Sequence, residues 1–260
     1  MTTLRRGDQG AEVEALQERL ADVGWYVEPH GRYEHTTEAA VRCFQKDSRG
    51  LLDDGIAGPR TLGALDTAPS SPEPPSAPFK WKVDMPWFSQ RDNHHAPSGT
   101  CNVTCLAMVL SRLGVVPRQA GKQLEDELFE DLESPEGQAY FRKTYAWADQ
   151  QGLNARNVHG MLTWLAERYG RTARRDANAD WSDVVRWAQR GRPTIISGRF
   201  TGSGHIICLV GETLRGDALV HDPWGDWERG YAPGHHDGAY RIYGQDRIRD
   251  VFKGVAHYIE

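Results

Sequence analysis

The chain has 260 residues, of which 39% are hydrophobic and 26% charged, as is ordinary for a soluble globular protein. Its formal net charge of −5 argues against a nucleic-acid-binding protein, which normally carries a basic face. No apolar run reaches the roughly 18 residues of a membrane span, and residues 1–6 lack the apolar stretch of a secretory signal. We expect a monomer that is made in the cytoplasm and neither enters a membrane nor binds nucleic acid.

Three short helices are predicted in the first 66 residues. Apolar residues recur at helical spacing over 12–23, and Gly24 ends that helix. A second helix begins after Thr36 or Thr37, and a third follows Gly58, where proline suits the first helical position.

A proline-rich segment, 67–78, separates this part from the rest of the chain. Proline donates no backbone hydrogen bond, so the segment is predicted to be an extended polyproline linker spanning on the order of 35 Å. We therefore expect a domain over 1–66, a linker over 67–78 and a larger domain over 79–260.

The larger domain shows helical patterns first and strand-like runs afterwards. Helices are expected over 102–113 and near 119–133, 135–151, 158–169 and 181–190. Strands are expected at 193–197, 205–210, 218–222 and 240–243. Helices followed by strands predict an α+β fold with a mostly antiparallel sheet.

The N-terminal part resembles the three-helix peptidoglycan-binding domain family. The resemblance covers residues 4–65 and is carried by these segments: Leu4-Arg5-Arg6-Gly7-Asp8-Gln9-Gly10, Gly31-Arg32-Tyr33, Phe44-Gln45 and Asp54-Gly55-Ile56-Ala57-Gly58-Pro59. The same residues also have a structural interpretation, with glycines in turns and glutamines bonded to the backbone. If the domain has a binding groove, Arg32, Tyr33 and Asp54 are its candidate contacts.

The chain has four cysteines, and their spacing fits no disulfide framework, so we expect reduced thiols. Cys101 follows a loop and opens a predicted helix, where unpaired N–H groups and the helix dipole favour a thiolate nucleophile. Cys43, Cys105 and Cys208 lie among apolar residues and are expected to be buried.

A thiolate nucleophile needs a base and a group that orients the base. His205 begins one predicted strand and Asp222 ends the next. If the two strands form a hairpin around 214–216, these side chains come close enough to meet. Gln90, eleven residues before Cys101, is a candidate donor to the oxyanion that forms during attack. Trp87, Trp224 and Trp227 flank these residues in sequence and are candidates either for a substrate groove or for packing.

The segments around these residues resemble the bacteriocin-processing-peptidase-like branch of the papain-type cysteine peptidases. The resemblance spans about 83–260 and rests on Gln90, the run Cys101-Asn102-Val103-Thr104-Cys105-Leu106-Ala107-Met108, and the segments Gly191-Arg192-Pro193, Gly204-His205 and His221-Asp222-Pro223. It implies that Gln90 is the oxyanion donor, Cys101 the nucleophile, His205 the base and Asp222 its orienting acid. Cys105 departs from the family pattern, which more often has a small hydroxyl residue there.

Together these features predict a peptidoglycan hydrolase that cleaves a peptide or amide bond of the bacterial wall without a cofactor. The combination resembles a modular phage endolysin. A secreted antibacterial toxin, a catalytically weak wall-binding protein and a leader-peptide protease are the alternatives. A zinc site built from His94, His95, Cys101 and Cys105 is disfavoured, because a Cys-x3-Cys spacing on one helix suits tetrahedral zinc poorly.

Overall fold

The computed structural model of the protein describes residues 2–260 and divides them into two compact units. The first contains the chain up to Trp81 together with Gly211–Asp217, and the second contains Lys82–Val210 and Ala218–Glu260.

The first unit is built on three helices, as the sequence predicts. They are α1 (Ala11–Asp22), α2 (His35–Asp47) and α3 (Pro59–Thr67). Gly24 has a φ of +98°, a conformation that glycine adopts without strain, and it follows the end of α1. The helices enclose an apolar core that includes Leu16, Leu20, Val41 and Phe44, and Cys43 is buried in it as expected.

Two buried glutamines fix the loops of this unit. The Gln17 side chain accepts from the Gly31 N–H at 2.9 Å and donates to the Arg32 carbonyl at 2.9 Å. Gln45 accepts from the Gly55 N–H at 2.9 Å and donates to the Ile56 carbonyl at 3.0 Å. The expectation that these glutamines bond to the backbone is confirmed.

The proline-rich segment is bonded to the first unit and is not a free spacer. The Ser71 N–H donates to the Asp22 carbonyl at 2.7 Å, and the Ser76 N–H donates to the Gly24 carbonyl at 3.0 Å. The Tyr26 N–H in turn donates to the Ser76 carbonyl at 2.9 Å. The segment therefore runs alongside the end of α1 instead of extending away from it.

The second unit begins its helical part with the helix predicted at 102–113, which is α4 (Cys101–Arg112). The predicted helix near 119–133 is shorter, as α5 (Leu124–Glu133). The predicted helix at 135–151 is interrupted at Tyr145, whose backbone is not helical. The remaining helices are α6 (Pro135–Thr144), α7 (Ala146–Gln150), α8 (Met161–Arg168), α9 (Trp181–Ala188) and α10 (Gln245–Val251).

The strands form one sheet in the order β2-β7-β3-β4-β5-β6, with β1 also paired to β4. The registered pairs β2–β7, β3–β4, β3–β7 and β5–β6 are all antiparallel, in agreement with the predicted fold class. The bounds are β1 (Phe79–Lys82), β2 (Ala173–Asp176), β3 (Thr194–Gly198), β4 (His205–Thr213), β5 (Ala218–His221), β6 (Arg241–Tyr243) and β7 (Phe252–Ile259).

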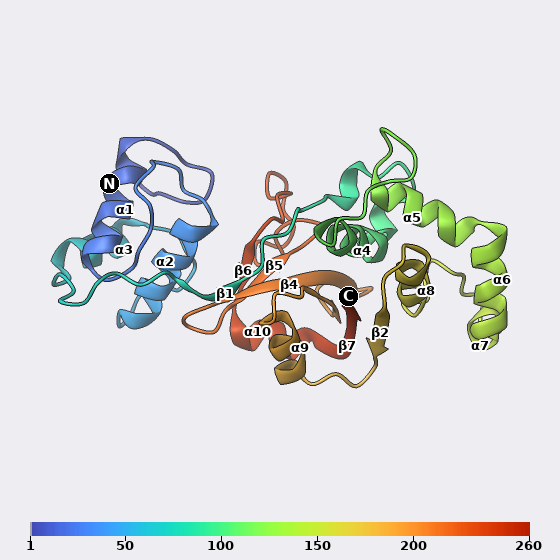
Figure 1. Cartoon of the computed structure of the whole chain (residues 1–260). Helices are drawn as coiled ribbons and strands as arrows, with labels where there is room; N and C mark the ends of the chain where they lie inside the picture. The colour runs from blue at the N-terminus through green and yellow to red at the C-terminus, as the bar shows by residue number, and fades with distance from the viewer. Residues whose placement is uncertain (1) are drawn as a thin grey trace. The chain divides into compact units, whose positions relative to one another are not determined.

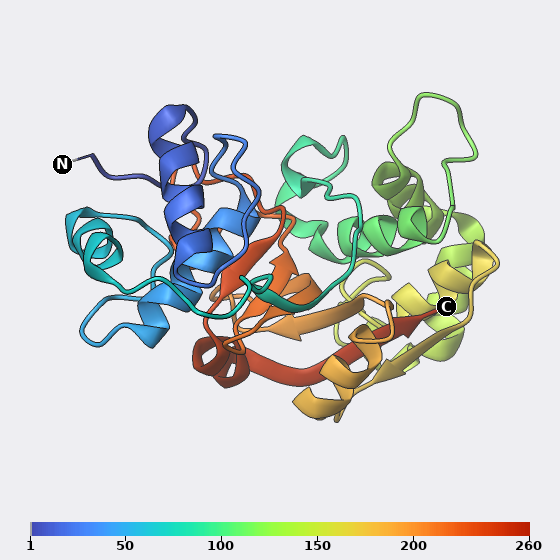
Figure 2. The same cartoon turned by 60° about the vertical axis from the view of Figure 1, so that its left-hand side comes forward.

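Helices cover both faces of this sheet (Figures 1 and 2). On one face α4 packs against β4, where the Cys208 thiol approaches the Cys105 carbonyl at 3.6 Å. On the other face α9 packs against β7 through the Trp187 and Tyr258 rings, whose centroids lie 5.0 Å apart. Because β4 and α4 are both buried, the residues at their ends are held on a rigid support.

Four elements are not expected from the local sequence: β1, β2, β7 and α10. β2 reads Ala-Arg-Arg-Asp and lies at the sheet edge, so it lacks the apolar alternation of a half-buried strand. β7 contains Lys253, Gly254 and His257, and its central position depends on pairing with β2 and β3. Tertiary pairing, rather than local pattern, makes these segments strands.

The substitution Gln45→Leu should destabilise the first unit. It leaves the Gly55 N–H and the Ile56 carbonyl without their bonds to this side chain, and each such group costs about 1–3 kcal/mol. We expect a loss of about 2–4 kcal/mol in the free energy of unfolding, measured by calorimetry on the full chain. The exposed Gln9→Leu is the matched control, expected to stay within about 0.5 kcal/mol of the parent. Equal stability of the two variants would contradict the role given to Gln45.

Candidate active site

Cys101 is the first residue of α4 and is partly exposed, whereas the other three cysteines are buried. The start of the helix is fixed by Asn93, whose side-chain amide donates to the hydroxyls of Thr100 and Thr104, each at 2.9 Å. As the first residue of α4, Cys101 lies at the N-terminal, positive end of the helix dipole.

His205, at the start of β4, is paired with Asp222 just after β5. The His205 Nε2 lies 2.7 Å from the Asp222 Oδ1, and both side chains are buried. The meeting of these two side chains across the hairpin is confirmed. Burial alone would lower the pKa of His205, but the Asp222 charge and hydrogen bond, with a further contribution from Cys101, raise it to about 10.

The Asp222 carboxylate accepts three further hydrogen bonds. The Trp224 N–H donates to Oδ1 at 2.9 Å, while the Tyr231 and Tyr243 hydroxyls donate to Oδ2 at 3.0 and 2.7 Å. Burial and the Asp222 charge raise the pKa of both tyrosines, so both remain protonated donors. Neither tyrosine was predicted as a site residue, because each is brought to Asp222 by folding and not by sequence spacing.

The backbone around Asp222 leaves no room for a side chain at Gly238. The Asp222 N–H donates to the Gly238 carbonyl at 3.0 Å. A Cβ added at Gly238 would lie 1.8 Å from the Asp222 carbonyl oxygen. Glycine is required here by close approach, since φ at this position is not positive.

Gln90 joins the loop before Cys101 to the loop after Asp222. It lies in a short 3-10 helix (Gln90–Asp92) and is 2% exposed. Its side-chain Nε2 donates to the Pro97 carbonyl at 2.7 Å, and its backbone N–H donates to the Pro223 carbonyl at 2.9 Å. An amide nitrogen has two hydrogens, so the bond to Pro97 leaves one for another acceptor.

The three candidate tryptophans make contacts that hold the site together. The Trp87 indole N–H donates to the Asp222 carbonyl at 2.9 Å. The Arg91 guanidinium lies 3.6 Å from the centre of the Trp224 ring. Trp227 packs edge-on against Tyr243, with ring centroids 5.4 Å apart. All three remain partly exposed, so these packing contacts leave surface open to a substrate.

The three candidate groove residues of the first unit differ in their exposure and contacts. Tyr33 is 2% exposed and its hydroxyl donates to the Gly55 carbonyl, so its contacts are structural. Arg32 is exposed and pairs with Glu34. Asp54 lines a cavity of about 290 Å³ together with Leu52 and Arg60, which the sequence analysis did not select.

Among residues 2–260, no cluster of three or more histidine, cysteine, aspartate or glutamate side chains could hold a metal ion. The arrangement that the structure does show is a thiol at a helix start, an adjacent buried His–Asp pair and a nearby amide donor. These are the groups that nucleophilic attack on a carbonyl requires.

Residues 82–246 match the Peptidase_C39 like family, which covers more than half of the chain. The chain belongs to this family. The resemblance seen in the sequence is therefore confirmed for the C39-like unit, and residues 9–65 match a peptidoglycan binding domain family.

Individual relatives of this C39-like protein match it over part of its length or at low sequence identity. The N-acetylmuramoyl-L-alanine amidase CwlL of Bacillus licheniformis is 38% identical over 79 residues, 29% of this chain and 22% of that protein. An L,D-transpeptidase structure from Xylanimonas cellulosilytica is 38% identical, with 32% of this chain and 39% of that chain covered and a TM-score of 0.25. The peptidase domain of Streptococcus ComA is 12% identical, with 66% and 96% covered and a TM-score of 0.43. The chain thus spans about a fifth of the amidase that it matches.

Iodoacetamide should label Cys101 before any other cysteine. Burial raises the pKa of Cys43 to about 11 and raises that of Cys105 well above its usual range, and Cys208 is buried. Peptide mapping after partial alkylation of the native chain at neutral pH measures the order. Cys101→Ser is the control and should leave the native protein almost unlabelled. If Cys105 were labelled first, Cys105 and not Cys101 would be the reactive cysteine.

The charge of Asp222 should set the alkaline limit of activity. The Asp222 charge raises the pKa of His205 to about 10, so the imidazolium persists well above neutral pH. The stability that this pairing gives is fully present below the unfolded pKa of about 6.5 and is lost as pH rises through the folded pKa. Asp222→Asn removes the charge, so the imidazolium, and with it the activity, should be lost at lower pH than in the parent. Turnover at neutral pH should also fall on the order of 10²-fold. An unchanged pH–rate profile in Asp222→Asn would show that this pair does not control the reaction.

Proposed function

We propose that this protein is a cysteine hydrolase of peptidoglycan that cleaves a peptide or amide bond of the bacterial wall. The observation that carries the proposal is the arrangement of Cys101, His205 and Asp222 in a chain whose residues 9–65 match a peptidoglycan binding domain family. The amidase that the chain matches in part supports the same substrate.

In the proposed reaction the Cys101 thiolate attacks the carbonyl carbon of the scissile bond. The second Gln90 amide hydrogen and the Cys101 backbone N–H donate to the oxyanion that forms. The His205 imidazolium then protonates the departing amine, which leaves a thioester on Cys101. His205, now neutral, deprotonates a water molecule that hydrolyses the thioester.

Asp222 supports each step without taking up a proton. Its bond to the His205 Nε2 directs the other ring nitrogen, Nδ1, toward Cys101 and stabilises the imidazolium form. The Tyr231 and Tyr243 hydroxyls, which donate to the other carboxylate oxygen, hold the carboxylate in place.

The first unit would concentrate the enzyme on its insoluble substrate. Binding the wall through a separate domain raises the local concentration of scissile bonds around the catalytic unit. We further propose an endolysin-type role, in which the protein is made in the cytoplasm and then acts on the wall. No helix among residues 2–260 has the length and apolar character needed to cross a membrane.

The wild-type chain should release soluble fragments from purified peptidoglycan, and mass spectrometry of these fragments identifies the bond cleaved. Cys101→Ser should release none while retaining its fold and its sedimentation with the wall, because a hydroxyl does not supply the thiolate. We expect its stability to change by less than about 1 kcal/mol. Hydrolysis by Cys101→Ser at the parental rate would refute the mechanism, and hydrolysis of leader peptides alone would refute the substrate.

A further inference from the structure

A cavity in the second unit is lined by none of the residues to which the proposed reaction assigns a step. It has a volume of about 360 Å³ and lies between the segment before Gln90 and the connection that joins α4 to α5. Trp87 and Phe88 form its aromatic wall, Ser111 belongs to α4, and Glu125 belongs to α5.

Glu125 is the unusual group in this cavity. The residue is 4% exposed, and among the described residues it forms no ion pair and accepts no hydrogen bond from another residue. Burial raises the pKa of Glu125 to about 7; a hydrogen bond from its own backbone N–H acts in the opposite direction, and the nearby charges of Asp126 and Asp92 add to the rise. A buried carboxyl group without a cation is costly, so a cationic ligand would bind it favourably.

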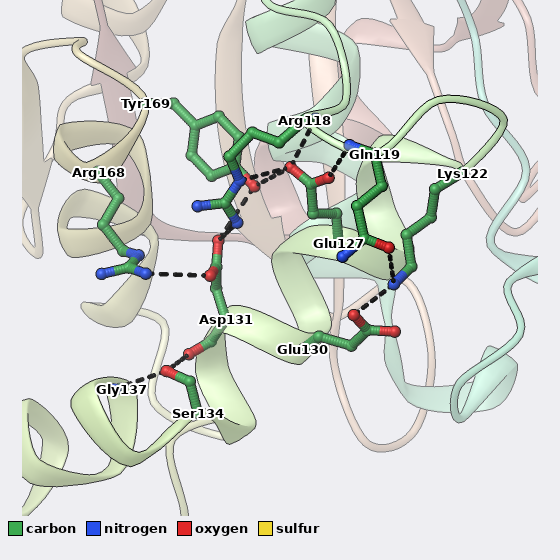
Figure 3. Close-up of polar contacts among 10 residues, drawn as sticks. All are labelled: Arg118, Gln119, Lys122, Glu127, Glu130, Asp131, Ser134, Gly137, Arg168 and Tyr169. Atoms are coloured by element: carbon green, nitrogen blue, oxygen red, sulfur yellow. Dashed lines mark hydrogen bonds and ion pairs between the residues drawn. The ribbon is translucent and has the colours of Figure 1, made fainter.

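The lysine that also lines the cavity is already engaged. The Lys122 ammonium forms an ion pair with Glu130 and donates to the Gln119 side chain at 3.4 Å (Figure 3). The charged neighbours that act on Glu125 are therefore acidic, and the cavity favours a cation over an anion.

The far wall of the cavity is held rigidly by a neighbouring network. Arg118 donates to Glu127 at 2.9 Å and to Asp131 at 2.5 Å, and the Tyr169 hydroxyl lies within hydrogen-bond distance of both carboxylates, at 2.6 and 3.0 Å (Figure 3). These bonds fix the segment that carries Pro117 and Lys122. Glu127 and Asp131 thus have partners within the protein, whereas Glu125, on the same helix, does not.

The cavity is close enough to the reactive thiol to hold another part of the same substrate. Ser89, which lines it, directly precedes Gln90. Ser111 lies ten residues beyond Cys101 on α4, about 15 Å along the helix axis. An extended peptide of about three to five residues covers such a distance.

We propose that this cavity binds a protonated primary amine of the substrate, such as the free amino group of an unlinked diamino residue in a wall peptide. The ammonium would bind the Glu125 carboxylate, and its aliphatic arm would pack on Trp87 and Phe88. The identity of the substrate rests on the proposed function, whereas the amine site itself does not.

The test uses purified peptidoglycan whose stem peptides contain a diamino residue. Half of the material is treated with acetic anhydride, which acetylates free amines. The wild-type chain should hydrolyse the untreated material about tenfold faster, since one charge-assisted bond contributes roughly that factor. In Glu125→Gln the ratio should fall to near one, through a higher KM with kcat little changed. Glu133→Gln, an exposed carboxylate on the same helix that does not line the cavity, is the matched control and should retain the ratio.

A second measurement does not depend on hydrolysis. N-α-acetyl-lysine amide should give a saturable change in the NMR signal of the backbone amide of residue 125 in the wild type and in Glu133→Gln. The same signal should not change in Glu125→Gln. An equal rate ratio in Glu125→Gln and the wild type, or no saturable binding of this probe to the wild type, would overturn the amine site. If the wild type binds the probe but hydrolyses no peptidoglycan, the proposed substrate is wrong and the amine site stands.

Discussion

The candidate site depends on replacing the lost hydration of one fully buried carboxylate, that of Asp222. Asp222 loses its hydration on folding, which would cost several kcal/mol if no protein groups replaced the water. An imidazole, a backbone N–H and two phenols replace it. Because these donors come from β4, β6 and the loop that follows β5, the Asp222 carboxylate is satisfied only when this part of the sheet and the loop are in place. The raised pKa of His205 is the consequence of this arrangement, and with it the thiol gains an imidazolium partner.

Gln90 connects the Asp222 carboxylate to the proposed nucleophile, Cys101. It is bonded to Pro97 on the Cys101 side and to Pro223 on the Asp222 side. A displacement of either loop therefore moves the amide as well. Gln90, the start of α4 and Asp222 are thus positioned relative to one another by one set of hydrogen bonds.

Three of the four proposed site residues could be selected from sequence because each lies at a recognisable local boundary, whereas Gln90 is selected by its distance from Cys101 and by the family resemblance. Cys101 opens a helix, and His205 and Asp222 lie at the two ends of a predicted hairpin. Tyr231 and Tyr243 could not be selected, because their approach to Asp222 depends on the course of a long irregular loop. The edge strand β2 and the strand β7 could not be predicted for a related reason, since their sequences show no alternation and only tertiary pairing orders them.

The burial of helix α5 could not be predicted from its composition either. Its acidic residues have the composition of a solvated surface, yet Glu125, Asp126, Glu127 and Asp131 are all buried.

The contact at Gly238 affects how related sequences should be interpreted. Any side chain there would collide with the Asp222 carbonyl, and the loop could relieve the collision only by moving the backbone that carries the acid. A homologue could thus retain glutamine, cysteine, histidine and aspartate at the four matching positions and still be inactive. Genome surveys that distinguish enzymes from inactive paralogues should therefore examine the position of Gly238 as well as the reactive residues, although glycine has no functional group.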